Sequence, residues 1–441
     1  MKSSLNDNFC SSPWFHVRID PAGQYLPCRW SSHQDPTGYY VANTSIAEFM
    51  NSDIMSGIRA RMLDGNGITM CSACLYEDTN NKVSGRQKQL LKSAISLNNF
   101  EKTFCSSPHW GVFEYSSKNQ GRTTKLPVDL QIDLGNTCNS ACIMCGPTYS
   151  SRLATEYHTL SKLEPLLFKA REPFKNWADD STQVDKFVDE LSQIPNIKYI
   201  HFLGGETLYL KSFYSICNKL VDAGIAKDIS IGTTTNCSIY TDELVNIIRN
   251  FKHVHLGLSV ESFNEVNDYI RWPSDISVVK SNIKKFLDLR DQTDLHLSLR
   301  ITPNILSVYH LPEVFEFMIQ NKITAESCNI LHNPSCLRLE LLPKELLGTV
   351  VDKINQVVQT YNLVDVNEKI VNRRREDLVD PVIAQVIFEY KHLLENIKEP
   401  ADVEQERCNL VKYIRAFEQV HKNTVLDYLP EYEEFLRSYG Y

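Results

Sequence analysis

Cys138, Cys142 and Cys145 stand in the segment C-N-S-A-C-I-M-C, directly after the apolar run of residues 128–134. Three thiolates on one short loop can bind three irons of a cubane [4Fe–4S] cluster, which is normally held by four cysteines. Because no fourth cysteine is near in the sequence, one iron would stay open for a small molecule. A structural zinc site and buried free thiols are the alternative interpretations of the same residues.

A second group of residues that could contact a bound molecule follows further along the chain. The strand-like run of residues 199–203 ends in Gly204, Gly205 and Glu206. Glycines let a backbone approach a ligand closely, and a carboxylate can pair with an ammonium group. Alone, this triplet is usually an ordinary turn, so its weight comes from its position after the cysteine motif.

The two motifs together resemble the signature of the radical S-adenosylmethionine (SAM) superfamily. The resemblance implies that Cys138, Cys142 and Cys145 hold a cluster whose open iron binds SAM, and that Glu206 meets the SAM amino group. The strand-like runs 229–236, 255–261 and 295–302 extend it. The other candidate contacts to SAM lie in two of these runs and just after them. They are Asn236, Ser259, Glu261 and Arg271. Arg271 would pair with the SAM carboxylate, whereas a loop or capping role is an equal alternative for Ser259 and Glu261.

Four further cysteines lie near the start of the chain, at positions 10, 28, 71 and 74. Cys10, Gly23 and Cys28, followed by the C-x-x-C pair Cys71 and Cys74, resemble the opening of a SPASM or twitch auxiliary-cluster module. The full seven-cysteine SPASM pattern is absent, so the resemblance implies one closed auxiliary [4Fe–4S] cluster. Zinc is the alternative, because four thiolates that include a C-x-x-C pair also suit a tetrahedral zinc site.

The elements expected around these motifs divide the chain into four parts. Residues 1–100 would form the twitch-like iron–sulfur module, 101–125 a linker, 126–345 the core and 346–441 a helical C-terminal region. In 126–345, short apolar strands alternate with helical stretches, which is typical of βαβ units and a parallel sheet. With the motifs, the expected fold class is α/β, a partial (β/α)6 TIM-like barrel. The cysteine loop would lie at the carboxyl end of its first strand, where such barrels keep their active sites.

The amino-acid composition limits the classes of binding partner that we expect. The chain has 46 Lys and Arg against 54 Asp and Glu, a net charge of −8, which disfavours nucleic acid because phosphate binding needs a basic surface. An uninterrupted apolar segment of about 18 residues, as a membrane span needs, is absent, and the N-terminus lacks an apolar signal region. We therefore expect no membrane partner and a cytoplasmic location, where 13 cysteines favour metal binding over disulfides.

The expected function is that of a radical SAM enzyme. It would cleave SAM reductively to a 5′-deoxyadenosyl radical and abstract hydrogen from an unactivated carbon of a peptide or amino-acid-like substrate. The auxiliary cluster would take part in electron transfer, and a flavodoxin or ferredoxin would supply electrons. Two alternatives stay open: the same chemistry on a sugar or other small metabolite, and a non-catalytic iron–sulfur or zinc scaffold or electron carrier.

Overall fold

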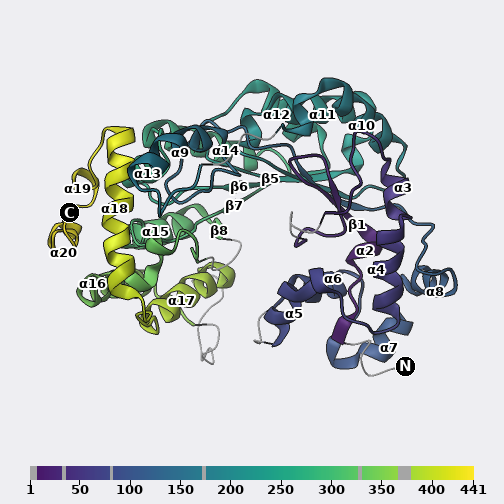
Figure 1. Cartoon of the computed structure of the whole chain (residues 1–441), viewed down its shortest axis with the longest axis horizontal. Coiled ribbons are helices and arrows are strands. Elements are labelled where there is room, and N and C mark those ends of the chain that lie inside the picture. The colour runs from purple at the N-terminus through teal and green to yellow at the C-terminus, as the bar shows by residue number, and fades with distance from the viewer. Residues whose placement is uncertain (1–6, 32–35, 80–82, 171–174, 326–329, 366–378) are drawn as a thin grey trace.

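A single curved sheet organises the chain (Figure 1). The computed structural model describes residues 7–31, 36–79, 83–170, 175–325, 330–365 and 379–441, and within them the sheet has eight strands in the order β2-β1-β3-β4-β5-β6-β7-β8. The strands are β1 His16–Ile19, β2 Tyr25–Leu26, β3 Asp129–Asp133, β4 Tyr199–Leu203, β5 Ser230–Thr235, β6 His253–Leu258, β7 Leu295–Leu299 and β8 Thr324–Ala325. All neighbours pair in parallel except β1 and β2, which are antiparallel.

Buried apolar residues alternate with polar residues along the strands, so the sheet has an apolar face and a polar face. Leu130 and Ile132 of β3, and Ile200 and Phe202 of β4, are fully buried, and α10, α11, α12 and α14 cover one face (Figure 1). Successive strand residues point to opposite faces, so Asp129, Gln131 and His201 belong to the other, polar face. The six parallel strands β3–β8 confirm the predicted partial (β/α)6 barrel.

Helices connect the strands, and further helices precede β3 and follow β8 in the described residues. The helices before β3 are α2 Ser12–Phe15, α3 Ile46–Met50, α4 Asp53–Leu63, α5 Ser72–Thr79, α6 Gly85–Lys92, α7 Phe100–Cys105 and α8 Trp110–Lys118. Those between β3 and β8 are α9 Ser151–Leu163, α10 Ser181–Gln193, α11 Lys211–Asp222, α12 Asp242–Asn250, α13 Val266–Ile270, α14 Ile276–Arg290 and α15 Leu311–Asn321. The last are α16 Lys344–Thr360, α17 Pro381–Glu395, α18 Val403–His421, α19 Val425–Tyr428 and α20 Glu433–Ser438.

The N-terminal segment packs around a cluster of aromatic rings. Phe9 lies 4.8 Å from Phe104 and 5.2 Å from Phe113 between ring centroids. Arg59 of α4, fully buried, donates a hydrogen bond of 2.6 Å to the carbonyl of Gly121. Residues 101–125, predicted as a linker, thus carry α7 and α8 and supply two core aromatics, because aromatic side chains within a polar stretch bury a large apolar area.

The N-terminal segment also joins the sheet itself. The strand β1 pairs in parallel with β3, with His16 opposite Asp129 and Arg18 opposite Gln131. His16 and Asp129 are 3.1 Å apart, and Arg18 lies 2.6 Å from Asp133. The segment between Cys10 and Cys28 is therefore paired with β3, the strand that leads into the loop of Cys138, Cys142 and Cys145.

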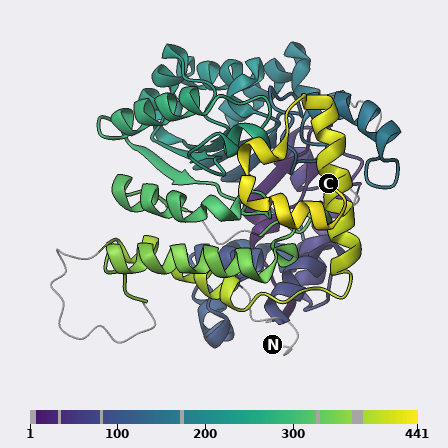
Figure 2. The same ribbon diagram turned by 90° about the vertical axis from the view of Figure 1, so that its left-hand side faces the viewer.

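The C-terminal region is helical, as predicted. The helix α18 runs along one side of the molecule, beside α9 and past α16 and α17 (Figure 2). Tyr413, Ile414 and Phe417 form part of its buried face. Among the described residues, none of the helices combines the length and apolar composition that crossing a membrane requires.

Candidate active site

A pocket of about 390 Å³ lies at the carboxyl ends of the central strands. Its lining brings together most of the predicted site residues, namely Cys138, Cys142, Cys145, Gly204, Gly205, Glu206, Asn236, Ser259 and Arg271. Residues from four successive strand ends meet here because parallel strands end at the same edge of a sheet. Glu261 is the predicted contact that does not line this pocket.

The cysteine loop is fastened to the neighbouring strand ends by hydrogen bonds. The side-chain amide of Asn236, after β5, donates to Asn139 Oδ1 and Ser140 Oγ, each at 2.9 Å. The backbone N–H groups of Ala141 and Ile143 donate to the carbonyls of Trp272 and Ile270. Asn236 therefore acts on the loop between Cys138 and Cys142, and its predicted contact with SAM stays a prediction.

The C-terminal helix α18 also reaches this loop. The buried hydroxyl of Tyr413 donates a hydrogen bond of 2.6 Å to the carbonyl of Ile143, between the second and third cysteines. The Tyr413 ring stacks on Phe168 with centroids 4.8 Å apart. Sequence reasoning missed Tyr413, since 270 positions separate it from its partner.

The three thiols are close enough to influence one another. Burial is the main cause that raises the pKa of Cys138 and of Cys145 to about 12, and proximity of Cys142 raises both further. Without a cation these groups are therefore neutral thiols at pH 7. Iron ions would stabilise the thiolates and release the protons, as metal binding to cysteine does. Soft sulfur donors on one loop beside a pocket fit an iron–sulfur cluster.

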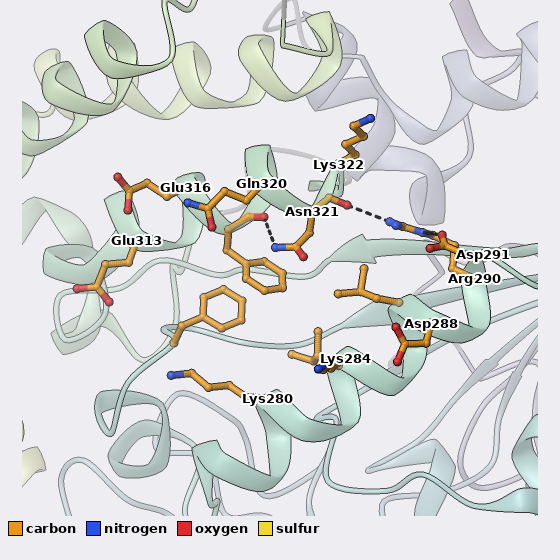
Figure 3. A pocket seen from close by; sticks show the side chains of 14 residues that line it. Lys280, Lys284, Asp288, Arg290, Asp291, Glu313, Glu316, Gln320, Asn321 and Lys322 are labelled. Atoms are coloured by element: carbon orange, nitrogen blue, oxygen red, sulfur yellow. Dashed lines mark hydrogen bonds and ion pairs between the residues drawn. The ribbon is translucent and has the colours of Figure 1, made fainter.

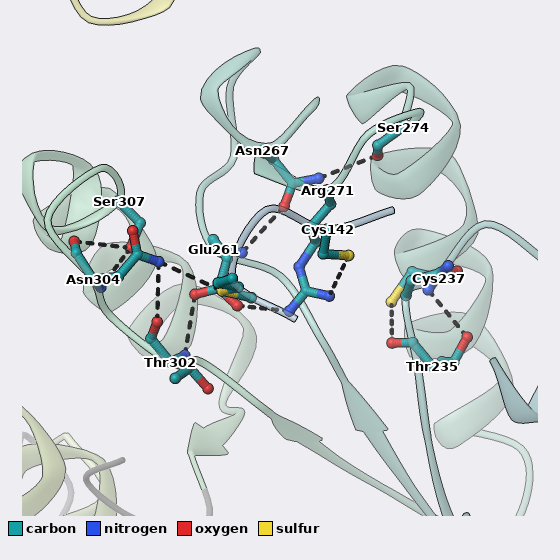
Figure 4. A network of polar contacts seen from close by, with 12 residues as sticks. Cys142, Thr235, Cys237, Glu261, Asn267, Arg271, Ser274, Thr302, Asn304 and Ser307 are labelled. Carbon is teal, nitrogen blue, oxygen red and sulfur yellow. Dashed lines mark hydrogen bonds and ion pairs between the residues drawn. The ribbon is translucent and has the colours of Figure 1, made fainter. Parts of the chain in front are cut away.

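Glu261 and Arg271 form a buried ion pair beside the cysteines (Figure 4). Arg271 Nη2 lies 2.6 Å from Glu261 Oε1, and Nη1 lies 4.0 Å from Cys142 Sγ. Glu261 Oε2 also accepts the N–H of Thr302 at 3.1 Å. Glu261 thus positions Arg271, whose predicted role as partner of the SAM carboxylate remains a prediction.

One donor of Arg271 is left over. Its Nε is buried and has no hydrogen-bond partner among the residues that the structure describes. Burial opposes the charge of Arg271, but Glu261 and Cys142 hold its pKa above the ordinary value. A permanent cation with an unsatisfied buried donor costs free energy. Arg271 also lines the pocket, so a carboxylate bound there would meet a permanent cation, and Arg271 fits the predicted anionic group of SAM.

The G-G-E turn is joined to the cysteine loop. A Cβ on Gly205 would stand 2.4 Å from the carbonyl oxygen of Thr137, so only glycine allows this close approach. The Glu206 carboxylate accepts the N–H groups of Asn236 at 2.7 Å and Leu208 at 3.2 Å, and burial raises its pKa. The glycines therefore bring two loops together, and Glu206 links the ends of β4 and β5.

The N-terminal cysteines meet at a second, largely apolar cavity. Cys10, Cys28, Cys71 and Cys74 all line it, together with Trp30 and Arg86. Burial raises the pKa of Cys71 to about 12, and the nearby Cys28 and Cys74 raise it further. In the described part of the chain, no three His, Cys, Asp or Glu side chains are spaced to hold a single metal ion.

A larger hollow of about 890 Å³ lies away from both cysteine groups, between α14 and α15 (Figure 3). Phe263 and Phe317 are among its lining residues, and their rings stack with centroids 4.0 Å apart. Its walls mix cations such as Lys284 with acids such as Glu316. Among the described residues that line this hollow, none is a predicted site residue, so the pocket at the strand ends is the candidate active site.

Comparison with known proteins found one matching family and several similar solved structures. The family described as the radical SAM superfamily matches residues 132–300. Among solved structures, Streptococcus suis SuiB bound to S-adenosylmethionine is similar, with 15% identity over 68% of this chain and 63% of SuiB, at a TM-score of 0.34. Native anSMEcpe with bound AdoMet has 15% identity over 54% of this chain and 61% of its own, at a TM-score of 0.36. No curated protein matches.

Proposed function

We propose, on the premise that residues 132–300 are a radical SAM domain, that this protein is a radical SAM enzyme acting on a peptide or amino-acid-like substrate. One observation carries the proposal: three cysteines, Glu206 and Arg271 surround one pocket at the carboxyl ends of the strands. A bound [4Fe–4S] cluster with SAM would supply one-electron cleavage of SAM and abstraction of hydrogen from carbon.

The residues of the chain would then have distinct roles. Cys138, Cys142 and Cys145 would hold the cluster and leave one iron for SAM. Arg271, which Glu261 holds at 2.6 Å, would bind the SAM carboxylate from the lining of the pocket. The buried walls of the pocket would exclude water from the reacting groups.

The four N-terminal cysteines would hold the second, auxiliary [4Fe–4S] cluster. With four thiolates this cluster would have no open iron, which favours electron transfer over substrate binding. The resemblance of these cysteines to SPASM and twitch modules supports an auxiliary cluster and does not distinguish a peptide from a sugar substrate. An external reductant such as a flavodoxin or ferredoxin would supply the electron that SAM cleavage consumes.

Anaerobic reconstitution with iron and sulfide tests the proposal. Iron and zinc are counted, SAM and dithionite are added, and 5′-deoxyadenosine is measured by chromatography. About eight irons per chain with 5′-deoxyadenosine formed would support two cubane clusters and radical chemistry. About four irons with activity would remove the auxiliary cluster. A fully loaded protein that does not bind SAM would contradict the enzyme proposal and favour an electron carrier.

A further inference from the structure

One aromatic side chain marks the mouth of the candidate active site. Of the described residues that line its pocket of about 390 Å³, Tyr149 is the one that is exposed, at 57%. The other lining residues are buried or half-buried. Tyr149 therefore stands where the pocket opens to solvent, and a molecule that extends out of the pocket meets its ring.

The volume of the pocket leaves a substrate little room beside the cofactor. Pockets that hold one drug-sized molecule measure about 300–1,000 Å³, and this pocket lies near the lower end of that range. In the proposed function, SAM would take most of the space between the three cysteines, Glu206 and Arg271. Part of the substrate must therefore remain at the mouth, beside Tyr149.

The backbone under this ring is fixed on both sides. The N–H of Tyr149 donates a hydrogen bond of 3.0 Å to the carbonyl of Gly146, which closes a turn. On the other side, the buried Ser150 caps α9 and donates a hydrogen bond of 2.6 Å to the carbonyl of Ser140 in the cysteine loop. The ring is thus exposed, whereas the cysteine loop and α9 hold the backbone that carries it.

The ring also lies close to the predicted cluster ligands. A Cβ on Gly146 would stand 3.6 Å from Tyr149 Cδ2 and 3.9 Å from its Cε2, so one edge of the ring lies over Gly146. Gly146 directly follows Cys145, the third cysteine of the loop. A group stacked on Tyr149 would therefore lie beside the active-site cluster.

Apolar side chains accompany Tyr149 in the lining of the pocket. Met144 is half-buried and Leu331 is buried in the same lining. Pairs of aromatic rings gain free energy beyond the burial of their area, and the thioether of a methionine also makes favourable contacts with aromatic rings. These side chains match a flat apolar group better than a charged one.

The polar side chains of the pocket are already bonded within the protein. Asn236 donates to two side chains of the cysteine loop, and Glu206 accepts two backbone N–H groups. Arg271 pairs with Glu261. A sugar needs a hydrogen-bond partner for each of several hydroxyls, because a buried polar group without one costs free energy. An aromatic side chain needs none, so the pocket favours it over a sugar ring.

We propose that Tyr149 is the stacking residue of a substrate subsite at the mouth of the pocket, and that the substrate places an aromatic side chain there. This assignment rests on the proposed function and narrows its peptide or amino-acid-like substrate to one with an aromatic ring close to the reacting carbon. A tyrosine on a fixed backbone loses little conformational entropy when a ligand binds. Holding a reactant in place beside the reacting group lowers the barrier of the reaction.

Matched amide probes test the subsite on the reconstituted protein, with SAM added and no reductant present. Saturation-transfer NMR titrations compare N-acetylphenylalaninamide with N-acetylalaninamide, which differ by one phenyl ring, and include methyl glucoside as a sugar. We expect the wild type to bind the phenylalanine probe about tenfold more tightly than the alanine probe. Equal binding of the two amides would refute the subsite. Methyl glucoside that binds as tightly as the phenylalanine probe would refute it as well.

Variants assign the preference to its residue. Tyr149→Ala is expected to abolish the preference for the phenylalanine probe, and Tyr149→Phe, which keeps the ring, should retain it. Tyr115→Ala is the matched control, because Tyr115 of α8 is also exposed, at 41%, and does not line the pocket. Since both tyrosines are exposed, neither alanine substitution removes a buried ring. A preference that survives Tyr149→Ala, or that Tyr115→Ala abolishes equally, would overturn the assignment.

SAM binding and 5′-deoxyadenosine formation distinguish failure of the subsite from failure of the proposed function. A wild type that forms 5′-deoxyadenosine and binds both amides equally keeps the radical chemistry and loses the subsite. A wild type that prefers the phenylalanine probe without binding SAM keeps the subsite and loses the proposed function. A Tyr149→Ala protein that no longer binds SAM would mean that the ring contacts SAM instead of substrate, and this too refutes the subsite.

Discussion

Tyr413→Phe is the substitution that most directly tests how the C-terminal region supports the active site. The change removes one oxygen atom and leaves the ring that stacks on Phe168. The carbonyl of Ile143 then loses a buried hydrogen bond of 2.6 Å. A buried polar group left without its partner costs about 1–3 kcal/mol. Because the lost bond lies inside the cysteine loop, opening of that loop should become easier by most of this amount.

Tyr432→Phe is the matched control. Tyr432 is also fully buried in the C-terminal region, and its hydroxyl donates a bond of 2.6 Å to the carbonyl of Ile305, outside the cysteine loop. Both variants should lose a similar free energy of unfolding in urea. Iron release to a chelator from the reconstituted protein should be about tenfold faster in Tyr413→Phe, since 1.4 kcal/mol corresponds to a factor of about ten.

Amide hydrogen exchange gives a readout that needs no cluster. The N–H of Ile143 bonds to the carbonyl of Ile270, so its exchange reports the opening of the loop directly. We expect faster exchange at Ile143 in Tyr413→Phe than in Tyr432→Phe. Equal exchange and equal iron release in the two variants would refute the idea that α18 holds the cysteine loop in place.

Three further tests address the rest of the molecule. Cys142→Ala should abolish SAM cleavage while iron at the N-terminal site survives, whereas Cys74→Ala should spare some uncoupled cleavage and end substrate turnover; iron counts and product chromatography check both, and full coupled turnover in Cys74→Ala would remove the electron-transfer role. Gly205→Ala places a Cβ 2.4 Å from a backbone oxygen of the cysteine loop, whereas Gly146→Ala would meet its nearest neighbour at 3.6 Å. Only the first should lose the visible absorption of the active-site cluster, and equal loss in both would contradict the steric argument. Burial opposes the charge of Asp129, but its neighbouring histidine, arginine and lysine hold its pKa below the ordinary value, so its carboxylate stabilises the fold above about pH 4 and less as the pH falls. The stability difference between wild type and Asp129→Asn in urea should therefore shrink from pH 6 to pH 3, and a constant difference would show that the charge is not responsible.

The parts of the site that lie near each other in sequence could be predicted from it. The cysteine spacing and the strands β3 and β4 are local patterns, and alternating apolar residues mark strands without knowledge of the fold. Gly204 and Ser259 both line the pocket because each directly follows a strand, and parallel strands end at the same edge of the sheet.

Contacts between distant segments could not be predicted in the same way. No local pattern indicates that Glu261 turns toward Arg271 instead of lining the pocket, or that Tyr413 reaches Ile143. The polar composition of residues 101–125 predicted a linker, but Phe104 and Phe113 bury their rings against Phe9. A few large side chains determine how residues 101–125 pack, and the average composition of this segment does not reveal them.

The antiparallel return of β2 determines where the two cysteine groups lie. Cys10 precedes β1, and β2 runs back along β1, so Cys28 returns to the amino end of that strand. Because β1 and β3 are parallel, Cys138 follows the opposite, carboxyl end of the neighbouring strand. The two groups therefore lie toward opposite ends of the same pair of strands, with the polar face of the sheet between them. In the proposed function, the auxiliary cluster and the SAM-binding cluster would therefore be held at opposite ends of this pair of strands.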